Sequence, residues 1–225
     1  MTSIDTVAEA VKIIANTALE NERYFCELDE AAGDGDFGYS LARGFEAVLN
    51  NWDSLDGSSV ASFLRGVATN LAARLGGTSG PIWATGFMRA GAAVKDRAEL
   101  DAGDVLAMIQ AAIAGIEHRG GASAGDKTLL DALWPLQRGI DEAIQRDDSP
   151  PAIAIAAATG ARQGATYTKQ LEAKRGRASY VGERSVGFED PGAVAVALMT
   201  ERIAQIWASG PGADATEPTK KETMK

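Results

Sequence analysis

Apolar residues recur along this chain at steps of three and four, the spacing of one face of an α-helix. A clear example is the run Val60, Leu64, Val67, Leu71 and Leu75. Alternating apolar and polar positions, which indicate a half-buried strand, are almost absent. The pattern therefore predicts an all-α protein.

Eight helical segments are predicted. They cover residues 7–18, 40–49 and 60–75, a helix from Pro81, residues 105–116 and 129–144, a helix from Pro150, and a helix from Pro191 to Ile206. Proline suits a first helical turn, whereas Pro135 inside the sixth segment predicts a kink. Many helix positions are Ala or Gly, which is typical of a closely packed antiparallel bundle.

The domain organisation follows from where this pattern stops. Residues 1–208 are predicted to form one helical domain. After Trp207 the composition turns to Gly, Pro, Thr, Glu and Lys, so residues 209–225 are predicted to be a flexible tail.

Four Gly-rich stretches fall between predicted helices, at residues 33–38, 76–80, 120–125 and 182–192. In an antiparallel bundle, the loops after the first, third, fifth and seventh helices share one end. Glycine lets backbone N–H groups approach an anion closely. We therefore expect an anion site formed by loops at one end of the bundle.

Charge and cysteine content narrow the class of partner. The net charge of −9 argues against nucleic acid and against an anionic membrane surface. No apolar stretch is long enough to span a bilayer, and no secretory signal is visible. The single cysteine, Cys26, cannot form an internal disulfide, which favours the cytoplasm.

The sharpest chemical signal is an acidic loop containing Asp29, Asp34 and Asp36. Gly33 and Gly35 allow this loop to curl, so that the three carboxylates converge. Converging carboxylates repel one another unless cations lie between them, and Mg²⁺ prefers such oxygen ligands. Taken alone, a solvated turn that caps the next helix is the commoner explanation of such a motif.

Two familiar alternatives fail on sequence. An EF-hand starting at Asp34 requires Gly at its sixth position and Glu at its twelfth, where this chain has Tyr39 and Phe45. A Walker loop requires Gly-Lys-Ser/Thr after a strand, but here Asp126 precedes Lys127 and the segment before it is predicted helix.

The other Gly-rich loops allow a phosphate-binding and a purely structural interpretation. Residues 76–80 precede the helix from Pro81 and suit an anion, or form an ordinary cap. Residues 120–128 either cover a nucleotide, with Lys127 near phosphate, or form a flexible loop. Arg177 and Arg184 either neutralise charge on a transferring phosphoryl group or make surface ion pairs.

Taken together, these segments resemble the nucleotide-binding L subunit of dihydroxyacetone kinases. The matching segments, in order, are residues 29–36, 77–80, 125–128 with 131–133, and 176–184 with 190–192. The resemblance implies an eight-helix antiparallel up-and-down barrel with the nucleotide at one end.

The resemblance also implies site residues. Asp29, Asp34 and Asp36 would bind two Mg²⁺ ions, and with Arg177 they would form the catalytic set. The residues expected to contact ADP or ATP are Phe37, Gly38, Tyr39, Ser40, Thr78, Ser79, Gly121, Leu129, Arg177, Asp190, Pro191 and Gly192. The family usually has His where this chain has Phe37, which puts that nucleotide contact in question.

The function implied is transfer of a phosphoryl group to dihydroxyacetone or a similar short ketose held by a separate K subunit, without which the chain would be inactive. The phosphate donor is either a phosphotransferase-system protein that recharges bound ADP, or exchangeable ATP, which Phe37 favours slightly. The rival interpretation is a nucleotide-sensing module that docks on a regulator. A homodimer is left open.

Overall fold

A computed structural model of the chain describes residues 3–95 and 97–209. Over these residues it contains helices and no strand, which confirms the all-α prediction. The elements are α1 (Ser3–Glu20), α2 (Glu22–Glu30), α3 (Phe37–Asn50), η1 (Trp52–Ser54), α4 (Val60–Arg74), α5 (Ser79–Ala93), α6 (Ala102–Gly120), α7 (Leu130–Gln145), α8 (Pro150–Tyr167), η2 (Thr168–Gln170), η3 (Arg177–Ser185) and α9 (Pro191–Ser209).

The described residues contain nine α-helices, where the sequence predicted eight, because α2 was not predicted. It continues the line of α1 after a break at Asn21, whose N–H donates to the Thr17 carbonyl at 3.2 Å. Phe25 is the only buried residue of α2, so the helix shows no apolar periodicity. The predicted flexible tail lies outside the described residues, apart from Ser209, which ends α9.

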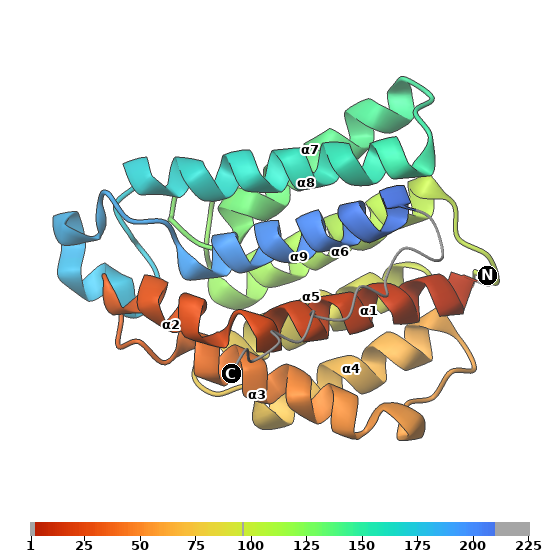
Figure 1. The fold of residues 1–225 in the computed structure, drawn as a ribbon, viewed down its shortest axis with the longest axis horizontal. Helices are drawn as coiled ribbons and strands as arrows, with labels where there is room; N and C mark the ends of the chain where they lie inside the picture. The colour runs from red at the N-terminus through yellow and green to blue at the C-terminus, as the bar shows by residue number, and fades with distance from the viewer. Residues whose placement is uncertain (1–2, 96, 210–225) are drawn as a thin grey trace, which may run out of the picture.

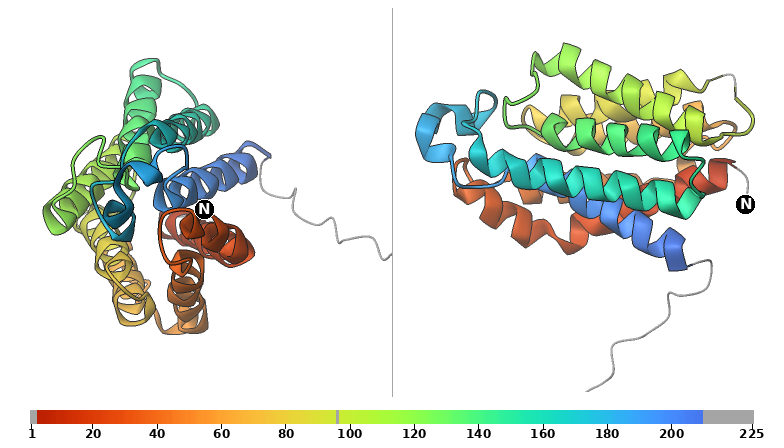
Figure 2. Two further views of the ribbon diagram at one scale, coloured as in Figure 1. Left: turned by 90° about the vertical axis from the view of Figure 1, so that its left-hand side faces the viewer. Right: turned by 90° about the horizontal axis from the view of Figure 1, so that it is seen from above.

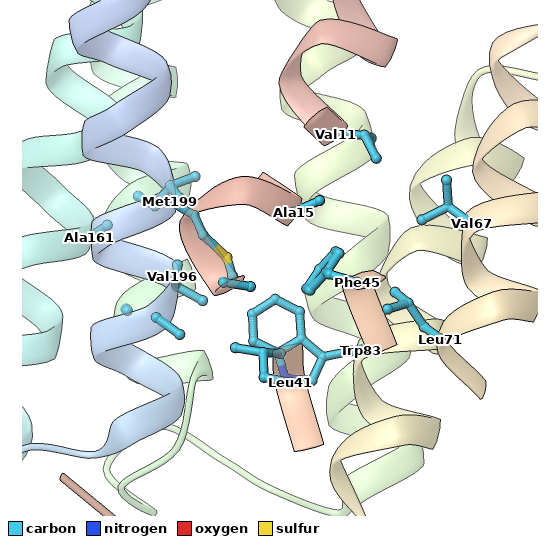
Figure 3. Close-up of a cluster of buried hydrophobic side chains, with 14 of the residues drawn as sticks. Val11, Ala15, Leu41, Phe45, Val67, Leu71, Trp83, Ala161, Val196 and Met199 are labelled. Atoms are coloured by element: carbon cyan, nitrogen blue, oxygen red, sulfur yellow. The ribbon is translucent and has the colours of Figure 1, made fainter. Parts of the chain in front are cut away.

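The helices form a ring in chain order (Figures 1 and 2). The rod of α1 and α2 packs on α3, each later helix packs on the next, and α9 returns to contact α1. The side chains inside this ring come from helices far apart in sequence. Those labelled in Figure 3 are Val11, Ala15, Leu41, Phe45, Val67, Leu71, Trp83, Ala161, Val196 and Met199.

Helices α7 and α8 approach closely through glycine. A Cβ added at Gly160 would lie 2.2 Å from the carbonyl oxygen of Pro135. A Cβ added at Gly164 would lie 2.1 Å from the carbonyl oxygen of Asp131. Pro135 has no N–H for the Asp131 carbonyl, and Gly164 packs directly over that carbonyl. Because Asp131 lies in the first turn of α7, this contact fixes the position of that turn against α8. No described helix is long and apolar enough to cross a membrane.

Candidate functional site

The loops after α2, α4 and α6 and the segment between α8 and α9 meet at one end of the ring, at the left of Figure 1. Together they line a cavity of about 540 Å³. The predicted convergence of the four Gly-rich regions is therefore observed. The chain thus returns to this end after α4, after α6 and in the segment between α8 and α9.

The acidic loop lies at this cavity. One carboxylate oxygen from each of Asp29, Asp34 and Asp36 lies within 4.8 Å of the other two. Glycine makes the arrangement possible, since a Cβ at Gly33 would lie 2.1 Å from Asp29 Oδ1. Gly35 has a φ of +76°, a left-handed conformation that glycine adopts without steric cost.

Two neighbouring groups interact with these carboxylates. The Phe37 backbone N–H donates to Asp29 Oδ2 at 3.3 Å. The Arg177 guanidinium pairs with Asp34 and lies 3.1 Å from Asp36 Oδ2. Three carboxylates and one guanidinium leave an excess of negative charge. The oxygen donors, their spacing and the exposure of Asp34 and Asp36 fit a Mg²⁺ site that keeps room for water or phosphate oxygens.

Most of the residues predicted to contact nucleotide lie on the cavity wall. These are Phe37, Ser40, Thr78, Ser79, Leu129, Arg177, Asp190, Pro191 and Gly192. Gly38, Tyr39 and Gly121 are not among the lining residues, and neither is Arg184, which is exposed. Contact with a nucleotide remains a prediction for all of these residues.

The residues off the wall have other structural positions. A Cβ at Gly38 would lie 2.0 Å from the Glu22 carbonyl oxygen, so Gly38 lets α3 pack closely on α2. Tyr39 is 50% exposed and its hydroxyl accepts a hydrogen bond from Arg43. Gly121 is the left-handed cap of α6, with a φ of +60°. Close packing and capping therefore account for both glycines.

Sequence reasoning missed the apolar part of the wall. It is formed by Ile82, Trp83, Ile116, Ala122 and Leu130, and the cations Arg119 and Arg175 also line the cavity. Apart from Ala122, which lies in the loop after α6, the apolar residues belong to helices with ordinary core periodicity. Nothing in that pattern distinguishes a side chain that lines a cavity from one that fills a core.

The sequence left two interpretations of Lys127 open, a contact with phosphate and a place in a flexible loop. The structure places Lys127 on the cavity wall but engages its ammonium group with other partners. Its side chain is only 4% exposed, and its ammonium group donates to the carbonyl oxygens of Leu171, Ser185 and Phe188. Three N–H donors are thus matched by three protein acceptors. The ammonium group has no donor left for a phosphate.

Asp190 caps α9 at the inner edge of the site. Its Oδ2 accepts the Ala193 N–H at 2.7 Å, and its own N–H donates to the buried hydroxyl of Thr168. The pKa of Asp190 is raised to about 7, with burial as the largest cause, and the negative charges of Asp131 and Asp29 act in the same direction. The Ala193 N–H and the Lys127 charge act in the opposite direction.

This raised pKa predicts a pH-dependent stability. The folded state binds the Asp190 proton more tightly than the unfolded state does. Protonation of Asp190 therefore stabilises the folded state fully below about pH 4, and this stabilisation is lost as the pH rises through about 7. Asn at this position does not titrate, so Asp190→Asn should not lose this stabilisation. In EDTA, the free energy of unfolding of the variant should therefore increase relative to that of the original protein by roughly 1–3 kcal/mol between pH 5 and pH 8. Urea unfolding measures both proteins, with Asp101→Asn at the exposed cap of α6 as control. Parallel pH curves would contradict the prediction.

Comparison with known proteins agrees with this geometry. Residues 31–205 match the family model of the DAK2 domain. The chain is 34% identical over 181 residues to the ADP-binding subunit DhaL of the PEP-dependent dihydroxyacetone kinase of Escherichia coli K12, covering 80% of this chain and 86% of that subunit. It is also 34% identical to a Listeria innocua DhaL, over 83% of this chain and 88% of that one.

Longer kinases contain a similar region. The chain is 34% identical to a D-erythrulose kinase of Mycolicibacterium smegmatis, but spans only 34% of that enzyme. The crystal structure of the dihydroxyacetone kinase from C. freundii in complex with AMP-PNP and Mg²⁺ superposes with a TM-score of 0.71 at 25% identity, covering 88% of this chain and 33% of that kinase. The protein therefore belongs to the DAK2 domain family and is similar over most of its length to the ADP-binding L subunits of dihydroxyacetone kinases.

Proposed function

We propose that this chain is the ADP- or ATP-binding subunit of a dihydroxyacetone-type kinase. The observation that carries the proposal is the group of three carboxylates, Asp29, Asp34 and Asp36, at a cavity with an apolar wall. The similarity to DhaL subunits over most of both chains supports it. We further propose that the ring is an eight-unit antiparallel barrel, with α1 and α2 counted as one unit, in a cytoplasmic domain of residues 1–208.

In this proposal the nucleotide base contacts the apolar wall and the phosphates point toward the aspartates. Thr78 and Ser79 lie at the start of α5, where free backbone N–H groups and the helix dipole favour an anion. Asp29, Asp34 and Asp36 would hold two Mg²⁺ ions. Bound Mg²⁺ supplies positive charge that offsets the phosphate charge during phosphoryl transfer.

The chain's own residues would complete the chemistry. The Phe37 N–H orients the Asp29 carboxylate. Arg177 reaches the carboxylates from η3 and would stabilise the charge that develops on the phosphoryl group. Asp34 and Asp36 are exposed, so the acceptor hydroxyl can approach from outside. We propose that a separate K-type subunit presents a short ketose there, and that this chain alone is inactive.

The phosphate donor distinguishes two versions of this proposal. Three relatives, from Escherichia coli and Listeria innocua, are named PEP-dependent, and a relative from Lactococcus lactis is named PTS-dependent. A phosphotransferase-system protein would recharge bound ADP here if the same chemistry applied. Phe37 lines the cavity and packs edge-on against Phe25, with ring centroids 6.2 Å apart. An apolar ring offers no hydrogen bond to a phosphate, which favours exchangeable ATP.

Calorimetry of nucleotide binding tests the proposal. We expect ADP and ATP to bind in the presence of Mg²⁺ and binding to weaken at least about tenfold in excess EDTA, since carboxylates and phosphates repel without a cation between them. Protein that is folded and freed of carried-over nucleotide, yet gives no heat in either condition, would refute the proposal. Binding without transfer in the presence of an active K-type partner would favour a nucleotide-sensing module.

A further inference from the structure

The buried residue Lys127 has no role in the function proposed above. It lies in the loop between α6 and α7 with a φ of +61°, a conformation that is uncommon for a lysine. The carboxylate of Asp131 holds this loop in place by accepting the N–H groups of Gly125 at 2.7 Å and Thr128 at 2.9 Å. The fold thus maintains an unfavourable backbone conformation at Lys127, which indicates a specific purpose.

The three acceptors of the Lys127 ammonium group belong to both ends of one segment. Leu171 accepts at 3.1 Å just after η2, Ser185 at 2.5 Å at the end of η3, and Phe188 at 2.7 Å shortly before α9. Residues 171–188, here called the Arg177 segment, include η3, which lies beyond the end of the bundle (Figure 1). One buried cation therefore joins the two ends of the segment that carries Arg177.

Other contacts strengthen this junction. Asp126, next to Lys127, is 6% exposed and accepts from Arg175 Nε at 3.0 Å, while its backbone carbonyl accepts the Lys174 N–H. The Ser185 hydroxyl accepts the Ala173 N–H at 2.9 Å and donates to the Gly182 carbonyl. Each of these bonds holds the base of the Arg177 segment, and two of the residues involved, Lys127 and Arg175, also line the cavity.

The Arg177 segment has little other means of holding its shape. It contains no α-helix, and its only regular element, η3, is interrupted at Gly182, where φ is +56° and ψ is −129°. Arg177 nevertheless extends from it to Asp36, which is 141 residues away in sequence. The position of the guanidinium at the carboxylates therefore depends on how firmly the base of the segment is held.

We infer that Lys127 is a positioning residue, which places Arg177 at the three aspartates by tying both ends of the Arg177 segment to the α6–α7 loop. Its three N–H donors are taken up by carbonyl oxygens, so removing it leaves the buried Ser185 carbonyl and the partly buried carbonyls of Leu171 and Phe188 without this donor. The inference rests on the proposed role of Arg177 in transfer, but the tie itself can be measured without nucleotide or partner.

The first measurement is hydrogen exchange of the free protein. In Lys127→Met, which keeps the chain length and loses the charge, amide protection in residues 172–188 should fall about tenfold or more, while α4 and α5 stay protected. Lys169→Met is the control, because the side chain of this half-exposed lysine of the same region forms an ion pair with Glu189 and does not contact Lys127 or its acceptors. Unchanged protection in Lys127→Met would overturn the inference.

The second measurement is a double-mutant cycle on transfer in the reconstituted kinase. Lys127→Met should lower kcat about tenfold in the original protein but less than about twofold in an Arg177→Ala background, because both changes act through one guanidinium. The dissociation constant of Mg²⁺-nucleotide should change less than about threefold. If Lys127→Met lowered kcat by the same factor in both backgrounds, or changed only the affinity for nucleotide, the inference that Lys127 acts by positioning Arg177 would be overturned.

Ser185→Ala covers the case in which Lys127→Met does not fold. It removes the bond to the Ala173 N–H without touching Lys127 or the cavity, so it should reproduce the loss of protection and of kcat in weaker form. A Ser185→Ala protein with the original exchange pattern would overturn the inference. If the original protein transfers no phosphoryl group with any K-type partner, the proposed function fails, and hydrogen exchange still decides whether Lys127 ties the segment.

Discussion

Replacing Asp34 with Asn is expected to lower phosphoryl transfer in the reconstituted kinase about 10²- to 10³-fold. The amide has nearly the same size as the carboxylate but no charge, and the site loses one of the three ligands that lie within 4.8 Å of one another. The Mg²⁺ concentration at half-maximal rate should rise in parallel. Steady-state kinetics over a Mg²⁺ titration measures both quantities.

The same substitution should have little effect on folding in EDTA. Removing one of three neighbouring carboxylates reduces their mutual repulsion, and Arg177 keeps its contact with Asp36 at 3.1 Å. The control is Asp53→Asn, which makes the same change of net charge at an exposed position in η1. If Asp34→Asn transferred phosphate at the original rate and with the original Mg²⁺ dependence, the proposed metal role of the cluster would be wrong.

Replacing Gly160 with Ala is expected to destabilise the protein by about 2–3 kcal/mol, although Ala normally stabilises a helix interior relative to Gly. The new Cβ would lie 2.2 Å from the Pro135 carbonyl oxygen, which is backbone and cannot rotate away. Helices α7 and α8 must therefore separate. Thermal unfolding should show a decrease in Tm of roughly 4–10 °C.

A matched glycine separates this steric effect from helix propensity. Gly86 is also buried inside a helix, but a Cβ there would lie 3.2 Å from Ile116 Cδ1, the far end of a flexible side chain. Gly86→Ala should therefore change stability by less than about 1 kcal/mol. Equal effects at the two positions would show that backbone contact between α7 and α8 does not limit stability. Because α7 starts at the cavity, Gly160→Ala should also weaken nucleotide binding.

The sequence alone determined the class of fold and the acidic cluster. Helical periodicity depends on spacing within one segment, so it is visible without knowing what the segment packs against. Counting the predicted helices placed the four Gly-rich loops at one end of the bundle. The break between α1 and α2 did not change this result, because the two helices continue one rod. The short acidic loop brought Asp29, Asp34 and Asp36 near one another through local chain geometry.

Tertiary structure decided which residues line the cavity and which hold it together. A glycine can bring its backbone close to a ligand or let two helices pack closely, and the sequence does not distinguish these roles. Only the nearby Glu22 carbonyl shows that Gly38 serves helix packing. A lysine in a Gly-rich loop suggests a phosphate contact, but the partners of Lys127 are backbone carbonyls, which every residue type carries. The apolar wall was hidden for a similar reason. Whether a helix face fills the core or faces a cavity depends on the segments that pack beside it, and those segments lie far away in the chain.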